Sequence, residues 1–113
     1  MSAITTHVLD IARGRPAAGV PVVLALREGD SWRELGRGVT DGDGRLRTLF
    51  PADEPLGPGV YRLLFDTGAY FTASGVDAFH PEAAVVFTVR DEGGRYHVPL
   101  LLAPFGYSTY RGS

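Results

Sequence analysis

The chain has 113 residues, of which 44% are hydrophobic and 21% charged, and its net charge is −2 at pH 7. This length predicts a single domain over residues 1–113. Cysteine is absent, which excludes disulfides, thiolate catalysis and Cys-ligated zinc. All 11 basic residues are arginines, which excludes lysine Schiff bases. These arginines are scattered along the sequence, which argues against nucleic acid or a membrane as partner.

Fifteen glycines and eight prolines divide the chain into short segments rich in Val, Leu, Phe and Tyr. This pattern is typical of an all-β sandwich. One short helix is expected at 69–74. Strands are expected near residues 4–10, 20–28, 32–38, 45–49, 59–66, 84–90, 95–103 and 104–111.

Between these segments the sequence predicts loops at 13–16 and 51–58. The glycines of the tight turn at 40–44 are expected to supply positive φ angles. Residues 91–94 read as a hairpin turn that joins the strands on either side. The first residues lack the basic and apolar regions of a signal peptide, so a cytoplasmic location is expected.

Two histidines lie on predicted strands near the two ends of the sequence. His7 would share a strand face with Thr5 and Leu9, with Val8 on the other face, and His97 lies in a similar apolar strand. A single histidine of this kind is more often a hydrogen-bonded, half-buried residue. Two of them favour a functional site, because histidine exchanges protons near neutral pH.

Metal binding is the alternative for these histidines, with a carboxylate such as Asp10, but no HxH or HExxH spacing supports it. His80 reads as a surface residue of a loop. Residues 41–44 resemble the opening of a calcium loop, yet the position that requires glutamate holds Ala52, so a plain turn is favoured. We therefore expect neither a metal nor a cofactor.

The turn at 41–44 would place Arg45 at the start of a strand, either as a solvated residue or as a clamp for an anion or carbonyl group. In the last residues Tyr107 and Thr109 would share one face, and Ser108 and Tyr110 the other. Spacing alone leaves open whether this segment is a polar edge strand or part of a site. No GxSxG elbow surrounds Ser108.

The consecutive residues Leu100, Leu101 and Leu102 require burial on both faces of one strand. In a two-layer sandwich only one face meets the core. The other face is expected to meet a second chain, which predicts an oligomer.

Four segments together resemble the 5-hydroxyisourate hydrolases, the transthyretin-related enzymes of purine catabolism. They are Thr6–Asp10, Asp41–Arg45, Tyr96–Leu102 and Tyr107–Ser113, and the resemblance extends from Ile4 to Ser113. The final Tyr110-Arg111-Gly112-Ser113 is the most specific element, because it separates the hydrolases from transthyretin, a hormone carrier of the same fold.

The resemblance implies a transthyretin-like sandwich of two four-stranded sheets with one short helix. It also implies a homotetramer with its sites where two dimers meet, and no cofactor. The substrate would be 5-hydroxyisourate and the product 2-oxo-4-hydroxy-4-carboxy-5-ureidoimidazoline. Carried over by motif, the catalytic residues are His7, Arg45, His97 and Ser113, and the substrate-binding residues are His7, Arg45, Tyr110, Arg111 and Ser113.

The hydrolysis of a cyclic amide requires an activated water, a stabiliser for the oxyanion and a proton for the leaving nitrogen. In our hypothesis His97 orients or deprotonates the water, and Arg45 stabilises the oxyanion. His7, with Tyr110 or Ser113, completes substrate binding and proton transfer. The division of roles between the two histidines is left open. The alternatives are a transthyretin-like carrier of a small ligand and a structural sandwich module.

Overall fold

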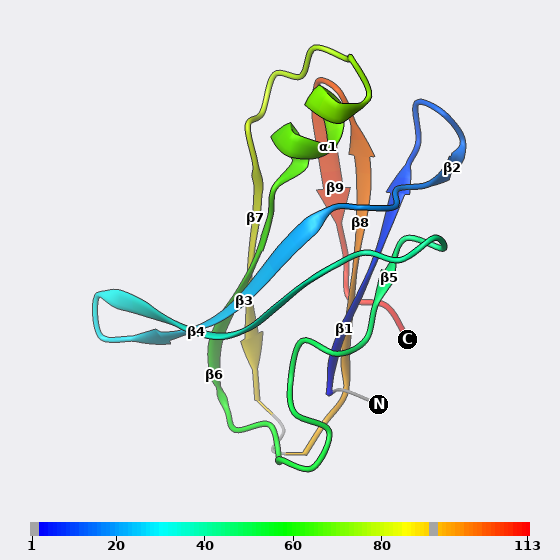
Figure 1. The fold of residues 1–113 in the computed structure, drawn as a ribbon. Coiled ribbons are helices and arrows are strands. Elements are labelled where there is room, and N and C mark those ends of the chain that lie inside the picture. The colour runs from blue at the N-terminus through cyan, green and yellow to red at the C-terminus, as the bar shows by residue number, and fades with distance from the viewer. Residues whose placement is uncertain (1–2, 91–92) are drawn as a thin grey trace.

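The computed structural model describes residues 3–90 and 93–113. In this part of the chain nine strands form two sheets that lie against each other, with one short helix at one end (Figure 1). The elements are β1 (Ile4–Asp10), β2 (Arg15–Pro16), β3 (Pro21–Glu28), β4 (Ser31–Val39), β5 (Arg45–Leu46), β6 (Gly59–Phe65), α1 (Thr67–Ala73), β7 (Ala83–Val89), β8 (Tyr96–Ala103) and β9 (Gly106–Thr109). The expected all-β sandwich with one helix is confirmed.

The first sheet has the order β2-β1-β8-β9, with β5 also paired to β1, and the second has the order β4-β3-β6-β7. Strands β1 and β8 come from opposite parts of the sequence and run parallel, with Thr5 opposite His97 and His7 opposite Pro99. Parallel strands need a long connection, and here most of the chain supplies it. This pairing brings the two predicted histidine strands side by side.

The first sheet has five strands in the described residues, so the expected four was wrong. Arg15–Pro16, expected within a loop, pairs with Leu9–Asp10 as β2. The strand expected at 45–49 is shorter and ends at Leu46. After it the chain turns into the core: Leu49 is buried, and its carbonyl oxygen would lie only 2.0 Å from a Cβ at Gly36 of β4.

The expected hairpin between β7 and β8 was also wrong. Asp91 and Glu92 lie outside the described residues, but β7 pairs with β6 whereas β8 pairs with β1 and β9. The connection therefore passes from one sheet to the other. Phe87 and Tyr96 face each other across the core with ring centroids 6.4 Å apart, so burial of these rings prevails over the local turn signal.

The two faces of β1 have different roles. Ile4, Thr6, Val8 and Asp10 are buried, whereas the residues between them are half-buried. Thr5, His7 and Leu9 therefore share one face and Val8 lies on the other, as expected. The Thr6 hydroxyl donates to the Val98 carbonyl at 2.6 Å, and Asp10 accepts from the Tyr70 hydroxyl at 2.7 Å. These buried polar groups therefore have partners within the fold.

Helix α1 begins two residues before the predicted helix and ends one residue earlier. Asp66 caps it, since its carboxylate accepts from the Ala69 N–H at 3.0 Å. This helix has seven residues, and none in the described part of the chain is long and apolar enough to span a membrane.

Candidate active site

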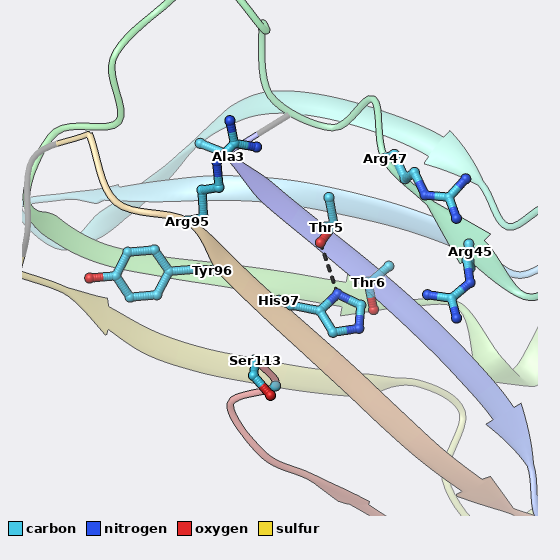
Figure 2. A pocket seen from close by; sticks show the side chains of 10 residues that line it. Ala3, Thr5, Thr6, Arg45, Arg47, Arg95, Tyr96, His97 and Ser113 are labelled. Carbon is cyan, nitrogen blue, oxygen red and sulfur yellow. Dashed lines mark hydrogen bonds between the residues drawn. The ribbon is translucent and has the colours of Figure 1, made fainter. Parts of the chain in front are cut away.

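A pocket of about 340 Å³ lies over the outer face of the first sheet, where β1, β5, β8 and the last residues of the chain meet (Figure 2). Its lining combines three arginines, one histidine and hydroxyl groups. The lining residues are Ala3, Thr5, Thr6, Arg45, Arg47, Arg95, Tyr96, His97, Gly112 and Ser113.

His97 is held in this pocket through the parallel pairing of β1 and β8. Its Nδ1 lies 2.8 Å from Oγ1 of Thr5, the residue directly opposite in the register. Both side chains are half-buried, and Figure 2 shows this contact between the two strands. This contact engages Nδ1 of the ring rather than Nε2.

The C-terminal segment reaches the same histidine from its other side. The Gly112 N–H donates to the His97 carbonyl at 2.7 Å, and the two residues form an isolated bridge. A Cβ at Gly112 would lie 2.6 Å from Cδ2 of the imidazole. Glycine thus allows this close approach, which brings Ser113 to the edge of the pocket.

Arg45 is positioned by the turn that precedes it. The carboxylate of Asp41 accepts from the N–H groups of Asp43 and Arg45, both at 2.9 Å. Gly44 has a φ of +75°, and a Cβ there would lie 2.4 Å from the Val8 carbonyl. The expected tight turn is therefore confirmed, although of its glycines only Gly44 has a positive φ.

The electrostatics of the pocket favour a neutral imidazole. Burial lowers the pKa of His97, and electrostatic interactions with Arg45, His7 and Arg47 lower it further. No acidic side chain belongs to the lining residues given above. The lowered pKa favours the unprotonated ring near neutral pH, and only this form can accept a proton.

The structure brings together three of the predicted site residues, Arg45, His97 and Ser113. His7 is the register partner of Arg45, but it does not line the pocket, and its Nε2 lies 2.8 Å from the Asp43 carbonyl. Since a carbonyl only accepts, this ring nitrogen carries a hydrogen.

Tyr110 and Arg111 lie at a different hollow of about 270 Å³, next to β7 residues such as Phe87. The Arg111 guanidinium lies 4.2 Å from the centroid of the Tyr96 ring and donates to the Arg95 carbonyl at 3.3 Å. In a single chain these two residues therefore do not line the pocket of His97.

Sequence reasoning did not select Thr5, Arg47, Arg95 or Gly112 individually as site residues. Alternation along β1 signalled only that Thr5 shares the face of His7. His80 is half-buried, and its ring contacts those of Phe79 and Tyr107. In residues 3–90 and 93–113 no group of three or more His, Asp or Glu side chains could hold a metal ion.

Comparison with known proteins gives consistent results. Residues 4–112 match the model of the HIUase/Transthyretin family. The chain is 46% identical over 110 residues to a 5-hydroxyisourate hydrolase of Salmonella dublin, covering 97% of this chain and 80% of that protein.

Two solved structures are similar over nearly the whole chain. 5-Hydroxyisourate hydrolase of Klebsiella pneumoniae has a TM-score of 0.84 at 42% identity and covers 97% of this chain and 98% of its own. Transthyretin from Sparus aurata has a TM-score of 0.91 at 37% identity and covers 99% and 97%. The family match over almost all residues and the parallel-paired sandwich together show that this chain belongs to the HIUase/Transthyretin family.

Proposed function

We propose that this protein is a hydrolase that opens the ring of 5-hydroxyisourate with water at the pocket of His97 and Arg45. The observation that carries the proposal is the imidazole of His97, in contact with Thr5 through Nδ1, in a pocket that three arginines also line. This setting lowers the pKa of His97 and favours its neutral form. The curated relative named above carries this enzyme name at 46% identity.

In the proposed first step, a water molecule attacks the carbonyl carbon of the six-membered ring while Nε2 of His97 takes one proton from it. A carbon–oxygen bond forms, and the carbonyl oxygen becomes an oxyanion. Arg45 donates hydrogen bonds to this oxyanion, because its guanidinium has only donors and a permanent charge.

In the second step the tetrahedral intermediate collapses. The carbon–nitrogen bond breaks, and the His97 imidazolium returns its proton to the leaving nitrogen. One water is consumed, and a carboxyl group and an N–H are formed, which gives 2-oxo-4-hydroxy-4-carboxy-5-ureidoimidazoline. No covalent enzyme intermediate is required.

His7 and Ser113 have supporting roles in this proposal. His7 donates from Nε2 to the Asp43 carbonyl, so we assign it to orienting the substrate rather than to the base. Ser113 lines the pocket and is assigned to substrate contact and proton transfer. Arg47 and Arg95 add positive charge that favours an oxygen-rich substrate.

The proposal includes a homotetramer of single-domain chains, located in the cytoplasm, with sites between two dimers. It is supported by the half-buried leucines Leu9 and Leu101, which lie opposite each other on the outer face of the first sheet. A second copy over this face would cover both leucines and close the pocket. Sedimentation velocity tests this part: a monomer at micromolar concentration would contradict it.

The test of the function is the ultraviolet decay of 5-hydroxyisourate, generated in place by urate oxidase, with and without the protein. A variant that lacks residues 110–113 serves as the comparison for the site. We expect decay well above the blank with the intact chain, and loss of most of the increase in the truncated variant. Decay equal to the blank would contradict the enzyme.

A carrier is the second candidate, because the structural similarity to transthyretin is as high as that to the hydrolase. A carrier would bind a small aromatic ligand and leave the decay unchanged. Binding of such a ligand without any increase in decay would favour this alternative.

A further inference from the structure

We propose that Thr5 is a positioning residue for the hydrolysis: its hydroxyl accepts a hydrogen bond from Nδ1–H of His97 and so keeps Nε2 as the proton acceptor. This inference rests on the proposed function and adds to it a residue that acts through the histidine rather than on the substrate.

The geometry of the contact is set by the backbone of the sheet. Thr5 and His97 are direct partners in the parallel register of β1 and β8, and Oγ1 lies 2.8 Å from Nδ1. Both residues lie within strands, and the neighbouring Thr6 hydroxyl ties the same strands together through the Val98 carbonyl. The strand register therefore fixes the position of the Thr5 hydroxyl opposite the His97 ring.

The surroundings of the ring select the direction of the hydrogen bond. A neutral imidazole has one N–H, and a threonine hydroxyl either donates or accepts. Figure 2 shows the second ring nitrogen on the side of the Arg45 guanidinium, and Arg45 has the largest effect of any charged group on the pKa of His97. A positive charge at this side disfavours a proton on Nε2, so the hydrogen belongs on Nδ1, where the hydroxyl accepts it.

The opposite edge of the ring is held as well. The backbone of Gly112 approaches so closely that a Cβ there would lie 2.6 Å from Cδ2. With one edge bonded to Thr5 and the other packed against Gly112, the imidazole is restricted in rotation. A fixed ring with a known tautomer is what a general base needs, because in water histidine favours the Nε2–H form, which cannot accept a proton at that atom.

The test compares Thr5→Val, which removes the hydroxyl and keeps the shape, with Thr5→Ser, which keeps the hydroxyl. Thr109→Val is the matched control, since the Thr109 hydroxyl also makes one hydrogen bond, to the Pro99 carbonyl at 2.7 Å, but does not line the pocket. Long-range proton–nitrogen NMR reports the tautomer of His97, assigned with a His97→Gln variant, and circular dichroism checks folding.

We expect Nδ1–H in the wild type, Thr5→Ser and Thr109→Val, and a substantial Nε2–H population in Thr5→Val. The loss of one hydrogen bond of this kind corresponds to a fall in kcat of about tenfold, with KM changed less. Wild-type kcat and tautomer in a folded Thr5→Val variant would overturn the proposal, as would Nε2–H in the wild type. A wild type without hydrolase activity would contradict the function, while the tautomer would still test the contact.

Discussion

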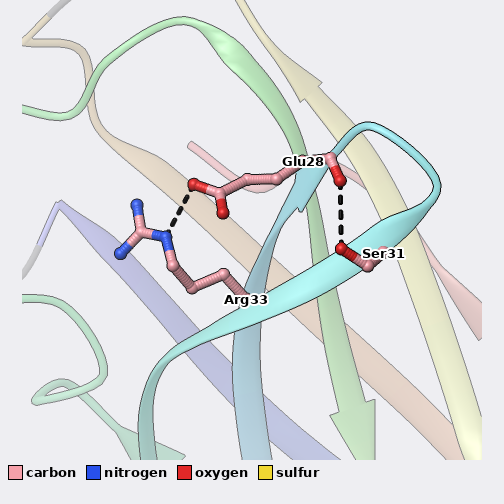
Figure 3. A network of polar contacts seen from close by, with 3 residues as sticks. All are labelled: Glu28, Ser31 and Arg33. Carbon is pink, nitrogen blue, oxygen red and sulfur yellow. Dashed lines mark hydrogen bonds and ion pairs between the residues drawn. The ribbon is translucent and has the colours of Figure 1, made fainter.

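Arginine occurs in two different environments in this protein, the β3–β4 hairpin and the pocket. In the hairpin, Arg33 contacts Glu28 at 2.7 Å, next to a turn that Ser31 closes (Figure 3), and Arg37 contacts Glu34 at 2.8 Å. Within residues 3–90 and 93–113, Arg45, Arg47 and Arg95 form no ion pair with a carboxylate side chain.

The hairpin arginines are paired with neighbouring carboxylates, whereas in the part of the chain that the structure describes the pocket arginines are not. An exposed pair contributes about 0–1 kcal/mol to stability, because water screens the charges and two flexible side chains are ordered. The pocket arginines lack this compensation and repel one another. In return they keep their donors available, and two of them lower the pKa of His97. A local electrostatic cost of this kind is expected where charge serves binding or catalysis, as we propose for this pocket.

Arg45→Ala should show the largest difference between the pocket arginines and the hairpin arginines. With Arg45→Ala the oxyanion loses its charged donor, and we expect kcat to fall by about 10²- to 10³-fold. Arg33→Ala is the matched control in steady-state kinetics and should retain wild-type kcat. Equal activity of both variants would contradict the assignment of Arg45.

The close packing of the C-terminal segment provides the next test. In Gly112→Ala the new Cβ must displace either the imidazole or the segment, so we expect a fall in kcat/KM of about 10- to 100-fold. Gly57→Ala is the control, because a Cβ at Gly57 meets nothing within 4 Å. The same kcat/KM in both variants would contradict a role of this close packing in activity.

The pH dependence tests the charge around His97. Its pKa is lowered below the ordinary value of 6.5, by burial first and then by Arg45, His7 and Arg47. Activity should therefore fall only as the pH drops below that value, when the base becomes protonated. Because the unfolded chain binds the proton more readily, stability should also decrease as the pH falls from that value towards the folded pKa.

An NMR titration of His97 checks this directly. Arg45→Ala should move the midpoint upwards, because one positive charge is removed, whereas Arg33→Ala should not move it. A midpoint above 6.5 in the wild type would contradict the electrostatic account.

The smallest effect is expected in the hairpin. The Arg33 side chain is 55% exposed, so Arg33→Ala should change the free energy of unfolding by less than about 1 kcal/mol. Urea denaturation measures this change. A loss of about 3 kcal/mol would show that the hairpin pair stabilises the fold far more than solvent screening allows.

Local patterns in the sequence predicted much of this fold. Alternation along residues 4–10 predicted that Thr5, His7 and Leu9 share one face of the strand, and the turn before Arg45 followed from its Asp and Gly residues. Both features depend on residues that are close together in the sequence, so they can be predicted from local patterns.

The contacts that assemble the site could not be predicted in this way. Thr5 and His97 are 92 positions apart, and their pairing depends on the parallel register of two strands. The connection at 91–94 carried a hairpin signal, but packing across the core assigned its strands to different sheets. Tyr110 and Arg111 likewise follow the last strand to another hollow, which no local spacing indicated.

The role of His97 as the general base is tested by the decay of 5-hydroxyisourate in the presence of a His97→Ala variant. The account predicts that the folded variant loses about 10²- to 10⁴-fold in kcat/KM relative to the wild type, the range expected when a general base is removed. A folded His97→Ala protein that hydrolyses the substrate as fast as the wild type would contradict the site and its mechanism.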